Sequence, residues 1–408
     1  MRSLILWSVL LLSLLAGGRY LSPVPLPKSY FIDLETYPCD NYCLQEHLQN
    51  GEIFSFLAKS SPQNIEGLQK EYQTYTVLFG TPSFLPTQHI RVTILSSHLL
   101  APYSDTVVKS LIAYFLQKEI TYQIRTVVYD KEDQIQDLVD QAYQSDLIIL
   151  PLDFDHKEVL STLSSEVPIF VPTLHRSFVS QADNHIFFGG ADYTGQLDRL
   201  LQLAQKRVAL FYLEHSTLSR LLSTHILQKP DILAKEYPID TTVSNLKNYL
   251  ENNKELNQSS VVLNTPIVKT ALILSQLTLY DIEPKNKLST QINYSPRLFT
   301  LTQPRDRHDL ILASSISTLP PKTAGALEAL GIDSHFDWLG YASFVGSDIF
   351  FSEFLGFQRE SQERLIDHQI GYDITLWRSE RFSFVPIEVP AQTPEEGERG
   401  EPPAYILE

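Results

Sequence analysis

From residue 89 onward the chain alternates between two hydrophobic patterns. Short apolar runs, such as the one that contains Val92, Ile94 and Leu95, are typical of buried strands. Longer segments follow in which apolar residues recur every three or four positions, as Val107 and Leu111 do, and this spacing predicts helices. The runs predict strands at 89–97, 122–130, 146–150, 167–174, 186–190, 206–215, 234–240, 259–266, 287–294 and 308–315.

Helices are predicted in most of the intervals between these strands, and Asp192 has a side chain suited to capping one of them. They fall at 105–115, 132–144, between 151 and 166, and at 193–205, 218–227, 244–253, 267–282 and 337–355, before a closing hairpin at 371–389. Strands that alternate with helices in units of about 30 residues form parallel sheets with helices on both faces. Because there are too many strands for one sheet, we predict an α/β fold of two lobes with a cleft between them.

Residues 1–88 and 390–408 lie outside this pattern, and their composition predicts how the rest of the chain is organised. Residues 1–18 are expected to be a signal peptide, and 19–88 a proline-rich leader with a hairpin of two helices parted by Ser60-Ser61-Pro62. The two-lobed domain is expected at 89–389, with lobe one at about 89–205, lobe two at about 206–305 and later crossovers. Residues 390–408 are rich in glutamate, proline and glycine, and predict a disordered acidic tail.

The N-terminus has the order of residues found in a secretory signal. Arg2 precedes an apolar run at 4–16, and the small residues Ala16, Gly17 and Gly18 follow. The run is shorter than the ~20 residues that a spanning helix needs, so export to the periplasm is predicted. The alternative is an uncleaved signal that anchors the chain in the inner membrane. A lipoprotein signal would need a cysteine after the small residues, and none is there.

Cys39 and Cys43 are the only cysteines, and His47 continues their four-residue spacing. In an oxidising compartment this spacing favours a disulfide, over two free thiols or a metal site. A metal site would use the helix face that the three residues share, but it lacks a fourth ligand, and Pro38 and Asp40 indicate a helix start. We therefore predict a disulfide, no metal and no cofactor.

The net charge of the chain and the motifs that it lacks limit the classes of function expected for the protein. The chain of 408 residues has a formal net charge of -16, which opposes the phosphate contacts that nucleic-acid binding needs. It has no Gly-x-Ser-x-Gly elbow, no His-Glu-x-x-His motif and no P-loop. These observations exclude nucleic acid as a partner and predict that the protein is not an enzyme.

Several stretches, in the right order, resemble the type I periplasmic binding proteins, the fold of branched-chain amino-acid receptors. The stretch TILSSHLLAPYSDTVVKSLIAYF looks like the first strand, loop and helix of that fold, and KRVALFYLEHSTLSRLL like the strand that enters lobe two. VVYDKEDQIQDLVDQAYQSDLIILPL, VPIFVPTL, FDWLGYASFVGSDIFF and IGYDITLWRSERFSFVPI supply further matches. Within the group, the chain looks most like the substrate-binding-like domain of the penicillin-binding-protein activator lipoproteins.

The departures from the family pattern affect its amino-acid site. The family's Gly-Pro is Leu150-Pro151, its first-loop Ser-Gly is Ser97-His98, and its lobe-two Tyr-Gly falls at Thr217-Leu218. The resemblance therefore implies that the fold is kept, while the usual amino-acid motif is absent. The family's fold would still place strand-end residues at the cleft, where they could bind a polar solute. These candidates are Ser96, Ser97, His98, Asp153, Phe154, Thr173, His175, Tyr193, Glu214, His215, Asn264, Thr265, Tyr294 and Ser315.

Each candidate has an alternative interpretation as a turn residue or helix cap. His98, His175 and His215 could suggest a metal, but their separation cannot be derived from spacing. Two hypotheses for function remain. One is a non-enzymatic binding protein that closes over a small polar solute, and the other is an envelope interaction module, such as a regulator or scaffold of peptidoglycan synthesis.

Overall fold

The computed structural model describes residues 32, 37–79, 81, 89–118 and 120–388. The predicted signal peptide at 1–18, most of the leader and the tail at 390–408 lie outside these residues. The chain divides into two compact units, residues 1–89 and 90–408, and each is described by itself. Among the described residues, no helix has the length and apolar character needed to cross a membrane.

The N-terminal unit contains three described helices, where the sequence predicted a hairpin of two. They are α2 (Asn41–Gln49), α3 (Ile53–Lys59) and α4 (Gln69–Phe79). The extra break comes at Gly51, whose φ of 72° lies in the left-handed region that glycine adopts at low cost and that ends a helix. The three helices enclose a small core formed by Leu44, Phe56, Leu57, Ile65 and Tyr72.

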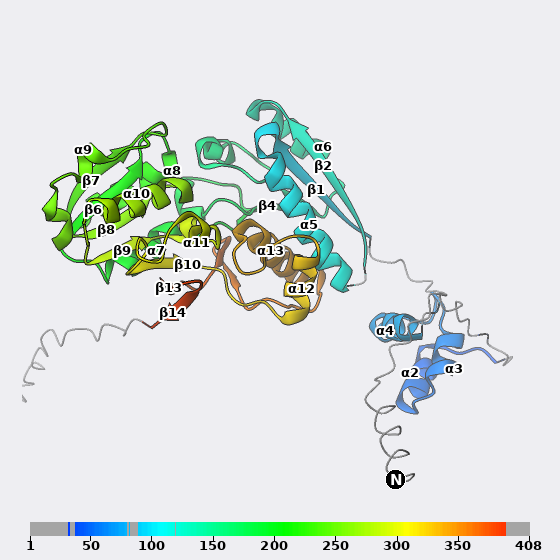
Figure 1. Cartoon of the computed structure of the whole chain (residues 1–408). Coiled ribbons are helices and arrows are strands. Elements are labelled where there is room, and N and C mark those ends of the chain that lie inside the picture. The colour runs from blue at the N-terminus through cyan, green and yellow to red at the C-terminus, as the bar shows by residue number, and fades with distance from the viewer. Residues whose placement is uncertain (1–31, 33–36, 80, 82–88, 119, 389–408) are drawn as a thin grey trace, which may run out of the picture. The chain divides into compact units, whose positions relative to one another are not determined.

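The second unit has two lobes, each built on one sheet (Figure 1). In lobe one the strand order is β11-β12-β5-β4-β3-β1-β2. β3 pairs parallel with β1 and β4, whereas β11 and β12 form an antiparallel hairpin. The strands are β1 (His89–Ser97), β2 (Thr121–Tyr129), β3 (Leu147–Ile149), β4 (Ile169–Val171), β5 (Ile186–Phe188), β11 (Arg364–Ile366) and β12 (Gln369–Gly371).

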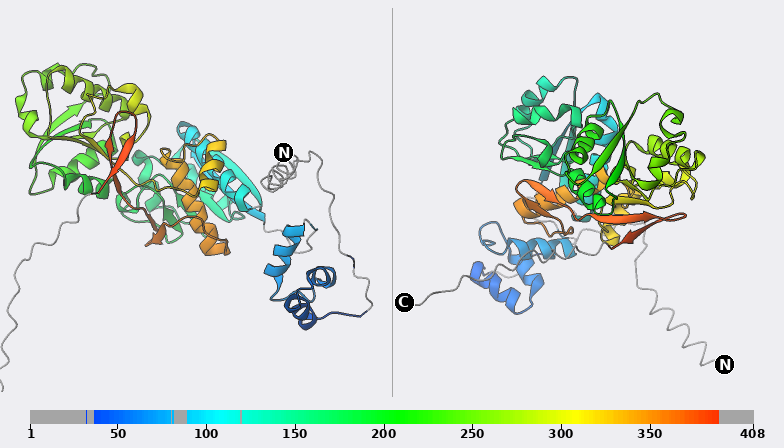
Figure 2. Two further views of the ribbon diagram at one scale, coloured as in Figure 1. Left: turned by 60° about the horizontal axis from the view of Figure 1, so that its bottom comes forward. Right: turned by 90° about the vertical axis from the view of Figure 1, so that its left-hand side faces the viewer.

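Lobe two repeats this plan, with the strand order β14-β13-β10-β9-β8-β6-β7. The five strands from β10 to β7 run parallel, and the hairpin of β13 and β14 adds two antiparallel strands at the edge opposite β7 (Figure 2). The strands are β6 (Arg207–Leu213), β7 (Leu233–Ile239), β8 (Ser260–Asn264), β9 (Asn286–Ser289), β10 (Leu310–Ser314), β13 (Thr375–Ser379) and β14 (Phe384–Ile387).

Helices cover both faces of each sheet, so each lobe has two hydrophobic core clusters. In lobe one, the 18-residue helix α13 packs along α5 (Figure 1), and Tyr114 stacks on Phe351 with ring centroids 5.7 Å apart. Lobe one carries α5 (Ala101–Lys118), α6 (Ile135–Gln141), α12 (Pro321–Ala329) and α13 (Trp338–Leu355). Lobe two carries α7 (Tyr193–Leu201), α8 (Thr217–Leu227), α9 (Lys247–Leu250), α10 (Ile267–Leu279) and α11 (Arg297–Leu301).

The chain passes between the lobes three times, at 189–192, 315–320 and 372–374, and we call these the connecting segments. The first lies earlier than the sequence predicted, because α7 packs against β9 and β10 of lobe two. Lobe one therefore ends near residue 188 on the first pass, whereas the predicted boundary was about residue 205. The α/β fold of two lobes with largely parallel sheets, preceded by a small helical segment, is confirmed.

Short polar elements account for the other differences from prediction. The strand predicted at 287–294 ends at Ser289, and a 3-10 turn, η6 (Gln291–Asn293), follows. The helix predicted between 151 and 166 is a 3-10 helix, η3 (Phe154–Ser161), and the one predicted at 244–253 is reduced to α9. The hairpin of β11 and β12 and helix α12 were not predicted. At η3 and α9, local side-chain hydrogen bonds compete with regular structure, and the three-residue strands β11 and β12 are too short to show a periodicity.

Candidate functional site

Buried polar side chains gather at the carboxyl ends of the central strands of lobe two. Asn264 ends β8 and Thr265 follows it, Thr290 and Asn293 follow β9, and Ser315 follows β10. Each of these five residues is at most 1% exposed. Because carboxyl ends of neighbouring parallel strands meet at one edge of a sheet, the five lie in the region where α/β folds bind ligands. We call them, with Gln196 and Gln291, the lobe-two polar cluster.

Two glutamines tie the strand ends together. Gln196 of α7 donates from Nε2 to the Oε1 of Gln291 (2.7 Å) and to the Oγ of Ser315 (2.9 Å). In return, Gln196 Oε1 accepts from the backbone N–H of Gln291 (3.0 Å), and Gln291 Oε1 accepts from that of Ser315 (3.0 Å). Hydrogen-bonded side chains in a region of low dielectric hold one another rigidly, so the cluster is preorganised.

Asn293 fixes the other side of the cluster. Its Nδ2 donates to the carbonyl of Thr265 (3.0 Å) and to the Oγ of Ser289 (2.8 Å), and that hydroxyl donates to the carbonyl of Leu263 (2.8 Å). The Thr265 hydroxyl pairs with that of Thr270 (2.8 Å). These bonds join the ends of β8 and β9 and explain why the chain turns at residue 290.

Four buried polar atoms on Asn264, Thr290 and Asn293 have no hydrogen-bond partner among the described protein groups. They are both side-chain atoms of Asn264, the Oγ1 of Thr290 and the Oδ1 of Asn293. A buried polar group left without a partner costs about 1–3 kcal/mol, so such groups are rare unless something else satisfies them. The cluster therefore offers one amide donor, a hydroxyl and two amide carbonyl acceptors to a polar solute or to ordered water.

Tyr193 lies beside this cluster, at the start of α7. Asp192 caps the helix by accepting from the backbone N–H of Gly195 (2.8 Å), as the sequence predicted. Burial raises the pKa of Tyr193 to about 12, a hydrogen bond from the Gln291 side chain lowers it, and Tyr103 of lobe one raises it further. Tyr193 thus carries a neutral phenol close to elements of both lobes.

In lobe one, Ser96 is buried in the sheet near the end of β1. Ser97 and His98 follow it and line a pocket of about 230 Å³. Ser96 donates only to the carbonyl of Ser97 (3.2 Å), and His98 pairs with Asp130 (3.2 Å) on the surface. The pocket is further lined by Tyr129, Glu132, Leu152 and His156, among others. Two of the predicted residues therefore line a small pocket at the carboxyl ends of β1 and β2.

The other lobe-one candidates have structural partners. Asp153 caps η3 by accepting from the backbone N–H groups of Asp155 and His156, both at 3.1 Å. Phe154 packs edge-on against Phe178. Thr173 accepts from the backbone N–H of Leu152 (3.0 Å), and His175 from that of Ser177 (3.2 Å), while burial lowers the His175 pKa. The hydrogen bonds of Asp153, Thr173 and His175 fit their alternative interpretation as helix caps and turn residues.

The remaining lobe-two candidates lie apart from the polar cluster. Glu214 and His215 are exposed, and His215 pairs with Asp240 (3.3 Å). Tyr294 is buried in an aromatic group with Trp377 and Phe384, at 5.4 Å and 4.9 Å between centroids, and burial raises its pKa to about 12. Of the described residues, only Cys39, Cys43 and His47 form a group with metal-ligand geometry, so His98, His175 and His215 do not.

Two positions that depart from the amino-acid-receptor pattern have defined roles. Leu150 is fully buried in the core of lobe one, so its side chain packs away from the strand end. Thr217, where such receptors carry tyrosine, donates from its hydroxyl to the Oδ1 of Asp155. Since Asp155 belongs to η3 of lobe one and Thr217 begins α8, this hydrogen bond joins the two lobes.

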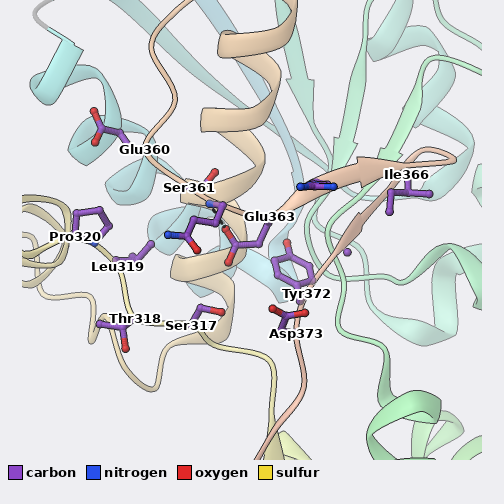
Figure 3. A pocket seen from close by; sticks show the side chains of 13 residues that line it. Ser317, Thr318, Leu319, Pro320, Glu360, Ser361, Glu363, Ile366, Tyr372 and Asp373 are labelled. Atoms are coloured by element: carbon purple, nitrogen blue, oxygen red, sulfur yellow. Dashed lines mark hydrogen bonds between the residues drawn. The ribbon is translucent and has the colours of Figure 1, made fainter.

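A larger pocket of about 700 Å³ borders two of the connecting segments (Figure 3). Ser317 and Pro320 line it from the second segment, and Tyr372 and Asp373 from the third, opposite the loop at 360–364. Tyr341, beneath it, donates from its hydroxyl to Glu363, and burial raises the pKa of both Tyr341 and Tyr372. Sequence analysis missed this pocket, because its walls come from segments without periodicity.

Comparison with known proteins identifies the fold. No family model matches the chain, and neither does any curated protein. Among solved structures, LivJ of Streptococcus pneumoniae, a branched-chain amino-acid transporter substrate-binding protein determined with isoleucine, has a TM-score of 0.55 at 12% identity over 74% of this chain and 100% of LivJ. The leucine-binding protein LivK of Thermotoga maritima has a TM-score of 0.53 at 13% identity over 73% and 98%.

LpoA of Haemophilus influenzae is also matched, at 11% identity over 79% of this chain and 64% of LpoA, with a TM-score of 0.49. The likenesses to LivJ and LivK, at identities of 12–13%, establish architecture alone. The protein has the type I periplasmic-binding-protein fold, as the sequence resemblance implied.

Proposed function

We propose that the protein is an exported, non-enzymatic binding protein that takes a small polar solute at the lobe-two polar cluster. The observation that carries the proposal is the set of four buried atoms on Asn264, Thr290 and Asn293 that no described protein group satisfies. They lie at the strand ends where α/β folds bind ligands. Preorganisation by Gln196 and Gln291 reduces the entropy lost on binding.

The chemistry of the cluster favours an uncharged, hydroxyl-bearing solute. Its side chains are amides and hydroxyls, which donate to and accept from hydroxyl groups. An amino acid would bring a carboxylate and an ammonium, and buried charges require partners of opposite charge or several hydrogen bonds. A sugar or polyol fits this set of donors and acceptors better than an amino acid does.

Periplasmic location and the absence of enzymatic activity belong to the same proposal. The fold occurs in the transporter substrate-binding protein LivJ and the leucine-binding protein LivK, and the apolar run at 4–16 has the composition of a signal. The cluster holds no carboxylate or histidine that could serve as a general acid or base.

The second candidate function is an envelope interaction module that regulates or scaffolds peptidoglycan synthesis. The hydrogen bond between Thr217 and Asp155 favours it, because it joins the lobes through a position that amino-acid receptors use for their ligand. Under this alternative the lobes would stay together without solute, and the partner would be another envelope protein.

One variant tests the proposal through two measurements, the binding of solute and the stability of the protein. Asn264→Leu removes both unpartnered atoms and keeps a similar volume, so we expect an unfolding midpoint that is unchanged or higher, because no satisfied hydrogen bond is lost at the side chain. Binding of the solute should weaken at least tenfold, since losing buried hydrogen bonds costs about 1–3 kcal/mol. Native mass spectrometry of the protein isolated from its own cells, and calorimetric titration with neutral sugars, polyols and amino acids, measure binding. Urea unfolding followed by circular dichroism measures the midpoint.

Asn286→Leu is the matched control, because Asn286 lies in the same lobe at the opposite end of β9 and donates to the carbonyl of Leu203 (2.7 Å). It should leave binding unchanged. A protein that carries no solute from its cells and binds none of the panel, but is recovered with an envelope protein, would overturn solute binding and support the interaction module.

A further inference from the structure

The N-terminal unit contains a group of side chains that the proposed function does not use. Cys39 and Cys43 form a disulfide at the start of α2. Asp40 caps this nine-residue helix by accepting from the backbone N–H of Cys43 (2.9 Å). A cysteine in the first turn of a helix has its thiolate form stabilised by the helix dipole, so Cys43, once reduced, would be a good metal ligand.

His47 lies one helical turn after Cys43 and is oriented by a carboxylate. Its Nδ1 pairs with the Oε2 of Glu52 at 2.6 Å, while its Nε2 is buried and has no hydrogen-bond partner among the described residues. A carboxylate on one ring nitrogen, with the other nitrogen free, is the arrangement found around histidines that bind zinc. Glu52 therefore leaves Nε2 as the nitrogen available for a metal.

The three potential ligands are close enough to share one ion. The two sulfur atoms and a ring nitrogen of His47 all lie within 4.8 Å of one another. Zinc binds thiolate sulfur at about 2.3 Å and imidazole nitrogen at about 2.0–2.1 Å, so two ligands of one ion lie no more than about 4.6 Å apart. To form the site, the S–S bond must open and the side chains must rotate until all three atoms lie within this limit.

We propose that reduction converts this disulfide into a zinc site formed by Cys39, Cys43 and His47. A dithiol reductant supplies two electrons and two protons, which cleave the S–S bond into two thiols while the reductant becomes a disulfide. Zinc binding then releases both thiol protons, and the ion is held by two thiolates and neutral His47. Water takes the fourth position, as in other sites with three protein ligands. The N-terminal unit thus binds zinc only when it is reduced.

Zinc also has a structural consequence for the reduced unit. The disulfide closes a ring of five residues, which restricts the unfolded chain and so stabilises the folded unit. Reduction removes this constraint, and a bound ion restores a link between the segment before α2 and the helix itself. The reduced unit should therefore be more resistant to proteolysis with zinc than without it.

The test uses the full chain in both redox states. The oxidised protein and a sample reduced with a phosphine, each incubated with ZnCl₂ and desalted, are compared by elemental mass spectrometry. We expect one zinc per reduced chain and none per oxidised chain. CoCl₂ in place of zinc should give the visible absorption bands of tetrahedral cobalt with thiolate ligands, a readout that needs no variant.

Variants assign the ligands. Cys43→Ser should abolish zinc binding and the cobalt spectrum, and His47→Ala should weaken zinc binding at least tenfold. His335→Ala, which removes an exposed histidine of the second unit, is the control and should bind like the wild type. Absence of zinc from the reduced wild type would overturn the proposal, as would zinc binding that persists unchanged in Cys43→Ser or His47→Ala.

Discussion

Gly190→Ala is expected to lower the free energy of unfolding by about 3 kcal/mol or more, at the upper end of what overpacking costs. Gly190 lies in the first connecting segment, and a Cβ there would come within 2.1 Å of the carbonyl carbon of Leu174 and 2.4 Å of the nitrogen of His175. Both are backbone atoms, so they cannot rotate away. The backbone N–H of Gly190 also donates to the carbonyl of Leu174 (2.9 Å), and this hydrogen bond holds the first connecting segment against residue 174.

Gly325→Ala is the matched control, because Gly325 lies in α12 and a Cβ there would meet no atom within 4 Å. Alanine in a helix interior is more favourable than glycine by about 0.5–1 kcal/mol, so this variant should be slightly more stable. Urea unfolding followed by circular dichroism measures both. Equal midpoints for wild type and Gly190→Ala would show that the first connecting segment is not closely packed against residues 174–175.

Arg307→Met should destabilise lobe two by about 3 kcal/mol, because it leaves the buried carbonyl of Thr302 and two partly buried carbonyl groups without donors. The Arg307 side chain is almost fully buried, yet it has no carboxylate partner in a salt bridge among the described residues. Its Nη1 donates to the carbonyl (2.9 Å) and hydroxyl (3.1 Å) of Thr302, its Nε to the carbonyl of Glu380 (3.3 Å), and its Nη2 to that of Arg381. It therefore ties the segment before β10 to the turn between β13 and β14.

The neighbouring Arg305→Met is the control, since Arg305 is exposed and makes only a long ion pair with Asp306 (3.8 Å). Exposed pairs contribute roughly 0–1 kcal/mol, so this variant should unfold almost like the wild type. Hydrogen exchange adds a local measurement: only Arg307→Met should speed exchange in residues 375–387. If the two variants unfold alike, the bonds from Arg307 to the turn do not contribute to stability.

The strands buried on both faces were the most predictable part of the fold. β6 and β8 are almost continuously apolar. When turn residues flank such an apolar run, few structures other than a buried strand fit it. β9 was predicted too long because Gln291 and Asn293 alternate with Ile292 and Tyr294 as in a strand. Their side chains instead bond to the backbone of Ser315 and Thr265, which follow neighbouring strands. The three-residue strands β11 and β12 are too short to carry a recognisable period.

Only those residues of the candidate site that lie at strand ends were predicted from the sequence. Asn264, Thr265 and Ser315 were expected at the carboxyl ends of β8 and β10, and the structure places them together. Gln196 and Gln291, which connect them, carry no signal in the sequence, because their roles depend on the packing of α7 against β10. Tyr294 was expected among them, but it lies one turn beyond the strand end and faces the aromatic core.

The late position of α13, β11 and β12 in the chain has a consequence for biosynthesis. Lobe one begins at β1, yet the helix that covers α5 and the strand that pairs with β5 are translated only after β10 of lobe two. As the ribosome delivers the chain in order, the apolar face of α5 and the open edge of β5 stay uncovered until residue 371 has emerged. Uncovered strand edges and apolar faces invite aggregation, so a nascent chain of this protein should depend on chaperones that keep it unfolded until synthesis is nearly finished.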